Sequence, residues 1–327
     1  MNLKLKKLLR DSKGVSQIIS VLVLTAVVIV GAVGAGMIMN TFSNEVADDT
    51  SAEGIGEGAA TELLIAGSTT VQPLSECLAK KYMEKNKGVR VIVQGGGSGA
   101  GVASTGLDIV DIGSASRAVK STELDKWPDI QTHQVGGSAV VVIASKFCNA
   151  NKTSASEMKA LYDGSGTTID GVTVDTVYER AESSGTEETF AKWINFRGPD
   201  KQLDPSSVAE GVVGNAGVLA AVEGCTTTCC VGFVDFGYAD GADVDMLNVT
   251  KHDDTGNYEP TSDNIKAALK GEDNKYPNDD KGLTRPLNYL TKGDPSTIEA
   301  DFLTFARSPA QKSCFDEAGY FAVWEFA

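Results

Sequence analysis

Short apolar stretches alternate with stretches of helical periodicity, and this alternation constrains the fold more than any other feature of the chain. Residues 62–66 have the length and composition of a strand, and apolar side chains in residues 73–85 recur at the spacing of one helix face. Ser154, followed three residues later by Glu157, predicts the start of another helix. Further strands are predicted at residues 89–93, 108–113, 137–145, 172–179, 232–238 and 287–291, and helices at residues 100–106, 154–162, 262–269 and 298–306. Alternation of this kind predicts an α/β fold.

The chain is acidic overall, but its charge is unevenly distributed. Its 327 residues carry 29 basic and 44 acidic side chains, a formal net charge of −15. Residues 1–14 are basic, with a net charge of +4, which leaves −19 on the rest. Binding to nucleic acid or to an anionic lipid surface requires a basic surface, so neither is expected. A small anion is not excluded, because it contacts only a few local groups.

Residues 15–39 contain no ionisable side chain, and this run is long enough to cross a bilayer. Because basic residues precede it, we expect residues 1–14 to be a cytoplasmic tail or signal and residues 15–40 a transmembrane or pilin-like helix. Residues 41–60 are predicted to be a flexible linker. The globular part would then be extracytoplasmic and anchored to the cell membrane.

The stretch from Lys13 to Ile19, KGVSQII, resembles the class III signal of archaeal pilin-like proteins. In such proteins a peptidase cleaves after the glycine and leaves the apolar helix in place. An uncleaved signal anchor and ordinary signal cleavage near residues 31–36 are alternatives. All of these interpretations export the rest of the chain.

The six cysteines, an even number in a chain expected to be exported, predict disulfide bonds without revealing their pairing. Cys225, Cys229 and Cys230 are close enough in sequence to suggest a metal site instead, but no nearby histidine or second cluster completes a tetrahedral set. The whole chain has two histidines. Neither a metal centre nor a cofactor is predicted.

Three predicted strands run into loops of glycine, serine and threonine that lead into helices, at residues 66–70, 94–100 and 182–187. The first turn of a helix has unpaired N–H groups and a partial positive charge, so such loops can bind an oxyanion. Arg117 and Arg180 are near these loops in sequence and can add a guanidinium. The middle loop lacks the Gly-Lys-Ser/Thr ending of a nucleotide P-loop, so the expected ligand is a small oxyanion.

Catalysis is not expected at these loops. Ser184 has no histidine or lysine close to it in sequence, and no nucleophile-elbow pattern surrounds it. Glu182, two residues after Arg180, is instead placed to hold the guanidinium of Arg180 in position.

From residue 62 to residue 327 the chain resembles the extracytoplasmic phosphate-binding proteins of high-affinity phosphate ABC importers, the PstS-like family. The resemblance rests on motifs in matching order and spacing: GSTTVQPL from Gly67, VQGGGSG from Val93, DIGSASR from Asp111 and RAESSGT from Arg180. It implies a two-lobed α/β fold of the periplasmic-binding-protein type (type II), with the ligand cleft between the lobes. Lobe 1 would comprise residues 61–135 plus 241–327, and lobe 2 residues 136–240.

The resemblance also implies a set of phosphate-binding residues: Ser68, Thr69, Thr70, Ser98, Gly99, Arg117, Arg180, Ser184, Gly185 and Thr186. At Arg117 some family members have an aspartate that accepts the proton of hydrogen phosphate. Discrimination against sulfate would therefore come from another group, such as Asp111 or Glu182, or be weaker. Arg285-Pro286-Leu287 and residues 231–238 also resemble the family and are expected to shape the hinge and a crossover between lobes, not to bind the ligand.

These features lead to the hypothesis of a non-enzymatic solute-binding protein, tethered to the membrane by its amino-terminal helix, that captures inorganic phosphate for an ABC permease. The alternative is a pilin-like structural subunit of a surface assembly that displays an oxyanion-binding domain. An extracellular phosphoryl-transfer enzyme is least favoured, because no nucleophile, base and metal set is visible.

Overall fold

The computed structural model describes residues 61–327, which belong to one compact unit. The predicted cytoplasmic tail, pilin-like signal, transmembrane helix and linker all fall in residues 1–60 and lie outside the described residues. Within residues 61–327, no helix is both long enough and apolar enough to cross a membrane.

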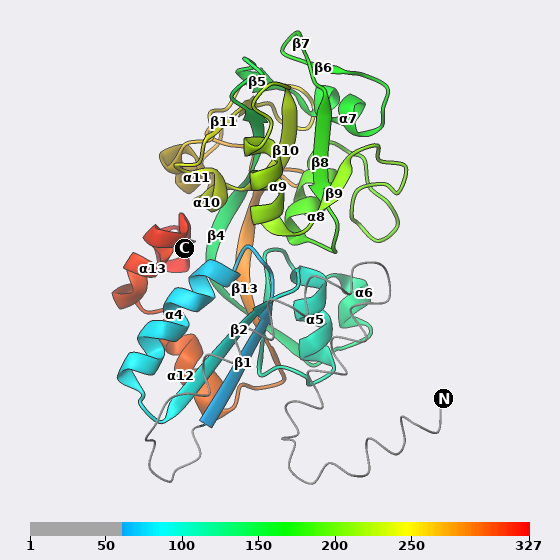
Figure 1. Cartoon of the computed structure of the whole chain (residues 1–327). Coiled ribbons are helices and arrows are strands. Elements are labelled where there is room, and N and C mark those ends of the chain that lie inside the picture. Colours follow the sequence, from blue (N-terminus) through cyan, green and yellow to red (C-terminus); the bar gives the residue numbers. More distant parts are fainter. Residues whose placement is uncertain (1–60) are drawn as a thin grey trace. The chain divides into compact units, whose positions relative to one another are not determined.

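The described residues form two lobes, each with its own hydrophobic core (Figure 1). In lobe 1, a parallel sheet of order β2-β1-β3 pairs Gly67 of β1 with both Gly95 and Ser114, so the carboxyl ends of the three strands lie at one edge. The elements of lobe 1 are β1 (Thr61–Gly67), α4 (Gln72–Lys85), β2 (Val89–Gly95), α5 (Ser98–Gly106), β3 (Ile112–Ala115), α6 (Ser121–Leu124), α12 (Thr297–Ala306), the 3-10 helix η2 (Pro309–Gln311), α13 (Lys312–Ala318), β14 (Phe321–Ala322) and the 3-10 helix η3 (Val323–Glu325).

Lobe 2 is built around a second set of strands, of order β10-β8-β9, in which β8 is parallel to both neighbours. Its elements are β5 (Lys152–Thr153), α7 (Ala155–Tyr162), β6 (Thr168–Ile169), β7 (Val172–Thr173), β8 (Thr176–Arg180), α8 (Gly185–Trp193), β9 (Glu210–Val212), α9 (Gly214–Glu223), β10 (Cys230–Asp235), α10 (Phe236–Ala239), β11 (Val244–Met246), β12 (Asn248–Val249) and α11 (Ser262–Leu269). Its core includes the stacked rings of Phe190 and Phe233, 4.1 Å between centroids.

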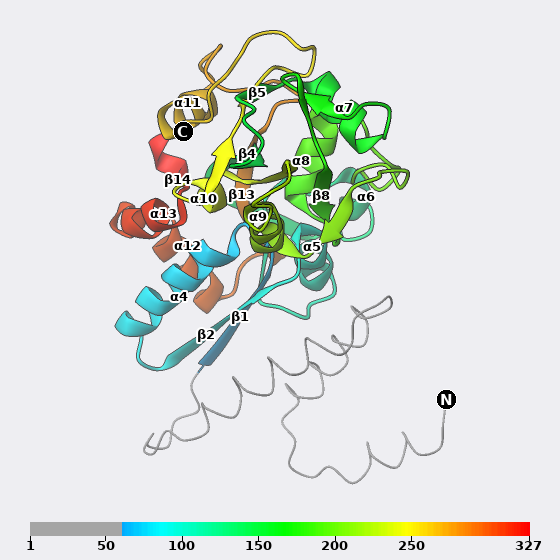
Figure 2. The same ribbon diagram turned by 45° about the horizontal axis from the view of Figure 1, so that its top comes forward.

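Two long strands, β4 (Ile130–Ser145) and β13 (Thr284–Lys292), run through both lobes and join their strands into one sheet (Figures 1 and 2). They pair in antiparallel fashion from Thr284 opposite Ala139 to Lys292 opposite Ile130, with a register shift between Leu287 and Asn288. The connections between the lobes are therefore paired strands, and any relative motion of the lobes must bend this ribbon.

The boundary between the lobes differs from the prediction at its second crossing. Residues 241–283, assigned from the sequence to lobe 1, pack in the core of lobe 2 through side chains such as Leu247, Ile265 and Leu283. The chain returns to the core of lobe 1 only from Leu287 onward. The second crossover is thus β13, and the prediction of residues 241–327 as a single part of lobe 1 is wrong.

The strand predicted at residues 232–238 is also shorter than expected. β10 ends at Asp235, whose side chain accepts a hydrogen bond from the N–H of Gly237 (3.2 Å) and caps α10. An aspartate at the end of a buried strand thus starts a helix, and its carboxylate is drawn into the protein interior.

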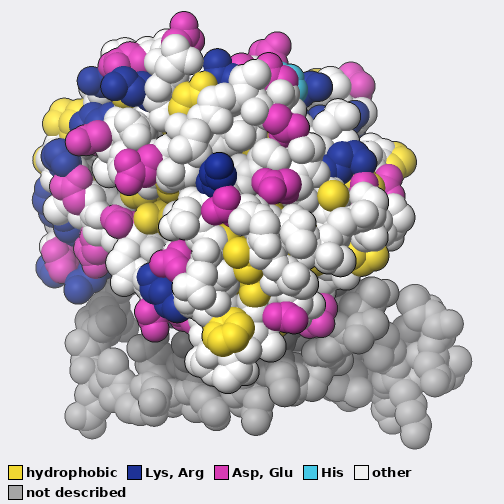
Figure 3. All heavy atoms as spheres, turned by 90° about the horizontal axis from the view of Figure 1, so that it is seen from above, with side chains coloured by type: hydrophobic (Ala, Val, Ile, Leu, Met, Phe, Trp, Pro, Cys, Tyr) yellow, Lys and Arg dark blue, Asp and Glu magenta, His cyan; other side chains and the backbone are white. Residues whose placement is uncertain are grey.

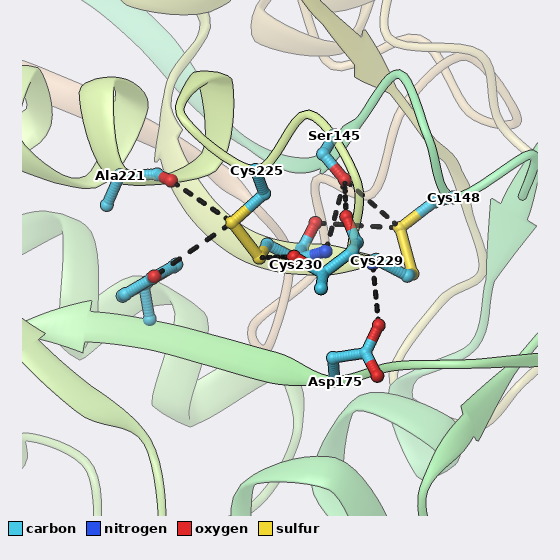
Figure 4. Close-up of a disulfide and its surroundings, with 9 residues drawn as sticks. Ser145, Cys148, Asp175, Ala221, Cys225, Cys229 and Cys230 are labelled. Carbon is cyan, nitrogen blue, oxygen red and sulfur yellow. Dashed lines mark hydrogen bonds between the residues drawn. A yellow bond between two sulfur atoms is a disulfide. The ribbon is translucent and has the colours of Figure 1, made fainter.

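All six cysteines form disulfides in the structure, which confirms the prediction and removes the metal alternative for Cys225, Cys229 and Cys230. Cys77–Cys314 joins α4 to α13 in lobe 1. In lobe 2, Cys148–Cys229 and Cys225–Cys230 hold the beginning of β10 to the turn after β4 and to the end of α9 (Figure 4). The adjacent Cys229 and Cys230 therefore bond to different partners.

Candidate functional site

The three predicted anion-binding loops lie together, two from lobe 1 and one from lobe 2. They follow β1, β2 and β8 and lead into α4, α5 and α8. The hydroxyl oxygens of Thr70, from the first loop, and Thr186, at the start of α8, are 3.2 Å apart. A Cβ added to Gly185 would lie 2.7 Å from the hydroxyl oxygen of Ser98, so the first turns of α8 and α5 meet.

Backbone donors face the same region. Gly97, the residue before α5, has a φ of +88°, a conformation that favours glycine. Because glycine has no side chain, no N-cap side chain accepts a hydrogen bond from the first N–H groups of α5. In α8 the Ser184 hydroxyl accepts hydrogen bonds from the N–H groups of Thr186 (3.1 Å) and Glu187 (3.4 Å). Ser68 accepts one from Val71 N–H (3.4 Å). Both serine hydroxyls retain a proton to donate.

Arg180 supplies a buried cation at the end of β8, as predicted. Its Nη2 donates to the Thr69 hydroxyl across the two lobes (2.8 Å) and pairs with Glu182, and its Nη1 donates to the Asn215 side-chain oxygen (3.4 Å). Burial lowers the pKa of this guanidinium, an effect opposed by the charge of Glu182. The prediction that Glu182 holds the guanidinium of Arg180 is confirmed.

Arg285 is a second buried cation, although its sequence motif predicts a role at the hinge and not at the site. Its Nη1 donates to the hydroxyls of Ser116 (3.2 Å) and Thr186 (3.0 Å), and its Nη2 donates to the Thr70 hydroxyl (3.1 Å). Nη2 also pairs with Asp235. Because Arg285 is on β13, it reaches hydroxyls of both lobes from the crossover between them.

Arg117 does not join this group of hydroxyls. Its Nη atoms donate to both oxygens of Glu123 (2.8 and 2.7 Å), and its Nε is 3.2 Å from a carboxylate oxygen of Glu188. Ser116, one residue earlier, carries the inward hydroxyl, which is 3.2 Å from that of Ser98. Arg117 is thus engaged by Glu123 and Glu188 and not by the hydroxyls, so nothing in this geometry supports the expectation that it contacts the anion.

The arrangement brings together hydroxyls, free backbone N–H groups and two guanidinium groups from both lobes, with a carboxylate already paired to each guanidinium. Such a set of donors fits a small oxyanion. Within residues 61–327, no group of three or more His, Cys, Asp and Glu side chains could hold a metal ion.

Comparison with known proteins agrees with this architecture. Residues 50–310 match the sequence model of a family described as the PBP superfamily domain. The chain belongs to the PBP superfamily. Its curated relatives include the phosphate-binding protein PstS of Bacillus subtilis, which is 25% identical over 87% of this chain and 88% of the relative. The phosphate-binding protein PstS of Staphylococcus saprophyticus is 24% identical over 89% of this chain and 88% of the relative.

Solved structures share the fold of this PBP superfamily domain. A protein from Clostridium perfringens, described as a phosphate ABC transporter substrate-binding protein and solved with bound phosphate, superposes with a TM-score of 0.66 at 21% identity, covering 80% of this chain and all (100%) of that one. An ABC-type phosphate transport receptor from Vibrio cholerae superposes with a TM-score of 0.60 at 24% identity, covering 79% of this chain and 99% of that one. The two-lobed α/β prediction is thus confirmed.

Several polar residues that hold the first of the three loops were not assigned to the site from the sequence. Asn215 donates to the Thr70 hydroxyl (2.9 Å), and the hydroxyls of Tyr238 and Tyr320 donate to the backbone oxygens of Thr69 (2.8 Å) and Thr70 (2.6 Å). Burial raises the pKa of Tyr238 to about 12, so it remains a neutral donor. These residues are distant in sequence from the loops they hold. Tyr238 is in the stretch 231–238, which resembles the family but was expected to shape the hinge, and no local pattern points to Asn215.

Asp111 and Glu182 were suggested in place of the family aspartate that accepts the proton of hydrogen phosphate, and the two lie at different positions in the structure. Asp111 accepts the N–H of Leu64 in β1 (2.6 Å), so its carboxylate is engaged away from the hydroxyls. Glu182 lies beside Arg180, and a Cβ added to Gly97 of lobe 1 would be 3.2 Å from its Cγ. Of the two, Glu182 is the carboxylate at the cleft.

The surface charge of the domain contrasts with its cleft. On the face of lobe 2 seen in Figure 3, basic and acidic side chains are interspersed, and hydrophobic side chains occur in small groups. This face has no continuous basic surface for a polyanion. The guanidinium groups of Arg180 and Arg285 are instead buried, each residue being 4% exposed.

Proposed function

We propose that the protein is an extracytoplasmic solute-binding protein that captures inorganic phosphate and delivers it to an ABC permease. The observation that carries this proposal is the meeting of Arg180, Arg285 and hydroxyls of both lobes at the first turns of α5 and α8. A ligand bound there would hold the lobes together. The names of the curated relatives, which are phosphate-binding proteins, favour phosphate over other small oxyanions.

The proposed ligand contacts come from both lobes. Lobe 1 contributes Ser68, Thr69, Thr70, Ser98 and Gly99, and lobe 2 contributes Arg180, Ser184, Gly185 and Thr186. Ser116 and Arg285 take the place that the sequence analysis gave to Arg117, because Arg117 is engaged by Glu123 and Glu188. The role is binding without catalysis, since this set of residues includes no nucleophile with an adjacent base.

The net charge of the chain is compatible with an anionic ligand. Each buried arginine has a carboxylate partner, Glu182 for Arg180 and Asp235 for Arg285, so the cleft is close to neutral. The ligand would be held by directed hydrogen bonds from hydroxyl, N–H and guanidinium groups, which do not depend on the long-range field of the molecule.

For the amino-terminal region, we propose that residues 15–40 anchor the domain in the membrane and that residues 41–60 tether it outside the cell. The charge asymmetry and the uncharged run support this topology. The pilin-like signal at Lys13 to Ile19 favours one alternative, a surface assembly in which the helix packs with its copies and displays the binding domain. Electron microscopy of native membranes would distinguish filaments from dispersed anchors.

Calorimetric titration of the purified full-length chain with inorganic phosphate tests the proposal. We expect stoichiometric, saturable binding of one phosphate and weaker binding of sulfate in a parallel titration. An absence of phosphate binding would remove the proposed function, and equal affinity for sulfate would make the protein a general oxyanion receptor.

A further inference from the structure

Asp235 is the most completely buried carboxylate at the cleft, with 0% exposure. Its Oδ1 accepts hydrogen bonds from the Ser138 hydroxyl of β4 (2.8 Å) and from Gly237 N–H (3.2 Å), and its Oδ2 pairs with Arg285. Two different elements therefore hold the carboxylate in place. It cannot turn toward solvent when a ligand arrives.

Arg285 determines how the surrounding hydroxyls are oriented. The Thr70 oxygen accepts hydrogen bonds from both Arg285 and Asn215 (3.1 and 2.9 Å), which uses both of its lone pairs. Its own proton is then left to donate, to the Thr186 hydroxyl 3.2 Å away in this structure or to a ligand placed between them. Thr186 and Ser116 also accept from Arg285. Arg285 thus makes hydroxyls of both lobes available as donors to an anion.

The two arginines of the cleft are neutralised in different ways. Glu182, the partner of Arg180, is on the same loop and its side chain is 21% exposed, so water screens its charge and it has room to move. Asp235 lies in the interior, where the effective dielectric constant is low and the attraction between unlike charges is stronger. An incoming anion therefore competes with Asp235 for the charge of Arg285.

From this geometry we propose that Asp235 limits the affinity of the site for its anion by keeping Arg285 paired. Asp235 is a positioning residue that acts through Arg285 and does not itself contact the ligand. The inference rests on the proposed function and adds to it an internal carboxylate that sets the strength of binding.

Calorimetric titration of the full-length chain with inorganic phosphate tests the inference through a double-mutant cycle. Asp235→Asn is expected to bind phosphate at least about tenfold more tightly than wild type, because Arg285 loses its competing partner. Arg285→Gln is expected to bind at least about tenfold more weakly. In the Arg285→Gln background, adding Asp235→Asn is expected to change affinity by less than about threefold, because no guanidinium is left to release.

Asp175→Asn is the matched control, because it changes the net charge equally but lies on the exposed side of lobe 2, where its carboxylate accepts the N–H of Cys229 (2.8 Å). It should bind as wild type does. Unchanged or weaker binding by Asp235→Asn would overturn the inference. An equal gain in both backgrounds would also overturn it, since Asp235 would then act by direct repulsion of the ligand.

If Asp235→Asn does not fold, Arg285→Lys provides a second test that keeps the buried ion pair. One ammonium group cannot reach Asp235 and the three hydroxyls together, so phosphate binding should weaken at least about tenfold. Wild-type affinity in this variant would contradict the inference. If the wild-type chain itself binds no phosphate, the proposed function fails first, and the two failures are thereby distinguished.

Discussion

Glu188 of α8 is 3.2 Å from the Nε of Arg117, and this ion pair connects lobe 2 to lobe 1 at the rim of the cleft. Lys120 of lobe 1 reaches the same carboxylate at 3.0 Å, and Arg197 of lobe 2 is 3.6 Å from its other oxygen. Arg117, expected from the sequence to bind the ligand, therefore contacts the opposite lobe. Its position indicates a role in holding the lobes closed.

Glu188→Gln should weaken phosphate binding by about three- to tenfold, because the apparent affinity falls with the fraction of molecules in the closed, binding-competent state. The loss should be smaller at high salt, where the pair is already screened in the wild type. Titrations at low and high ionic strength measure both effects. Glu62→Gln, which removes an ion pair with Arg90 inside lobe 1, is the control. Equal affinity in all three proteins would mean that Glu188 does not act in closure.

Gly185→Ala should abolish most phosphate binding while leaving the fold intact. An added Cβ would lie 2.6 Å from the Ser116 hydroxyl and 3.0 Å from the Ser116 backbone oxygen, so the lobes could not close to the same distance. We expect at least about a tenfold loss of affinity and little change in thermal stability without phosphate, because alanine is favourable in a helix.

Gly88→Ala is the matched control for this substitution, because nothing lies within 4 Å of a Cβ placed there. Its affinity should equal that of wild type. Normal phosphate binding by Gly185→Ala would show that α8 does not approach lobe 1 in the bound state.

Local signals in the sequence were sufficient for much of the fold. The helix predicted at residues 262–269 is α11, and Ser154 accepts the N–H of Glu157 (3.1 Å) while Glu157 accepts that of Ser154 (2.8 Å), as the capping pattern predicts. The assignment of residues 241–283 to a lobe failed, because it depends on which distant core these residues join. No periodicity encodes that choice.

The candidate site was predictable in its loops and in Arg180, but not in Arg285. Arg180 ends β8 and directly precedes the Ser-Gly loop at residues 182–187, whereas Arg285 is inside β13, away from any such loop, and was expected to act at the hinge. Ser116 and Arg117 show why residue type alone does not decide: they are adjacent in sequence, yet Ser116 accepts a hydrogen bond from Arg285 and Arg117 pairs with Glu123 and Glu188. Only the tertiary positions of Glu123 and Glu188 determine where the Arg117 side chain lies, and no local pattern encodes them.

The stability of the protein should depend on the protonation of Glu187. Burial raises the pKa of this carboxyl to about 8. The negative charge of Glu179 also raises the pKa, whereas the hydrogen bond from the N–H of Leu203 (3.0 Å) and the positive charge of Arg180 lower it. The folded state therefore keeps a proton that the unfolded state releases, because an exposed glutamate has its ordinary pKa of 4.5. The contribution is fully present below the unfolded pKa and is lost as pH rises through about 8.

Thermal and urea unfolding of wild type and Glu187→Gln between pH 5 and pH 9 measures this contribution. The amide cannot ionise, so the stability of the variant relative to wild type should rise by up to about 1.4 kcal/mol per pH unit until the pKa is passed. A constant difference across this range would show that Glu187 is ionised in the folded protein.

In the proposed function, a phosphate ion is held between the lobes by the buried guanidinium of Arg180. Paired calorimetric titrations of wild type and Arg180→Gln with inorganic phosphate test it most directly, with Arg90→Gln, at an exposed arginine of β2, as the control. We expect saturable binding by wild type and Arg90→Gln and a loss of affinity of much more than about tenfold in Arg180→Gln. Near-wild-type affinity in Arg180→Gln would contradict it.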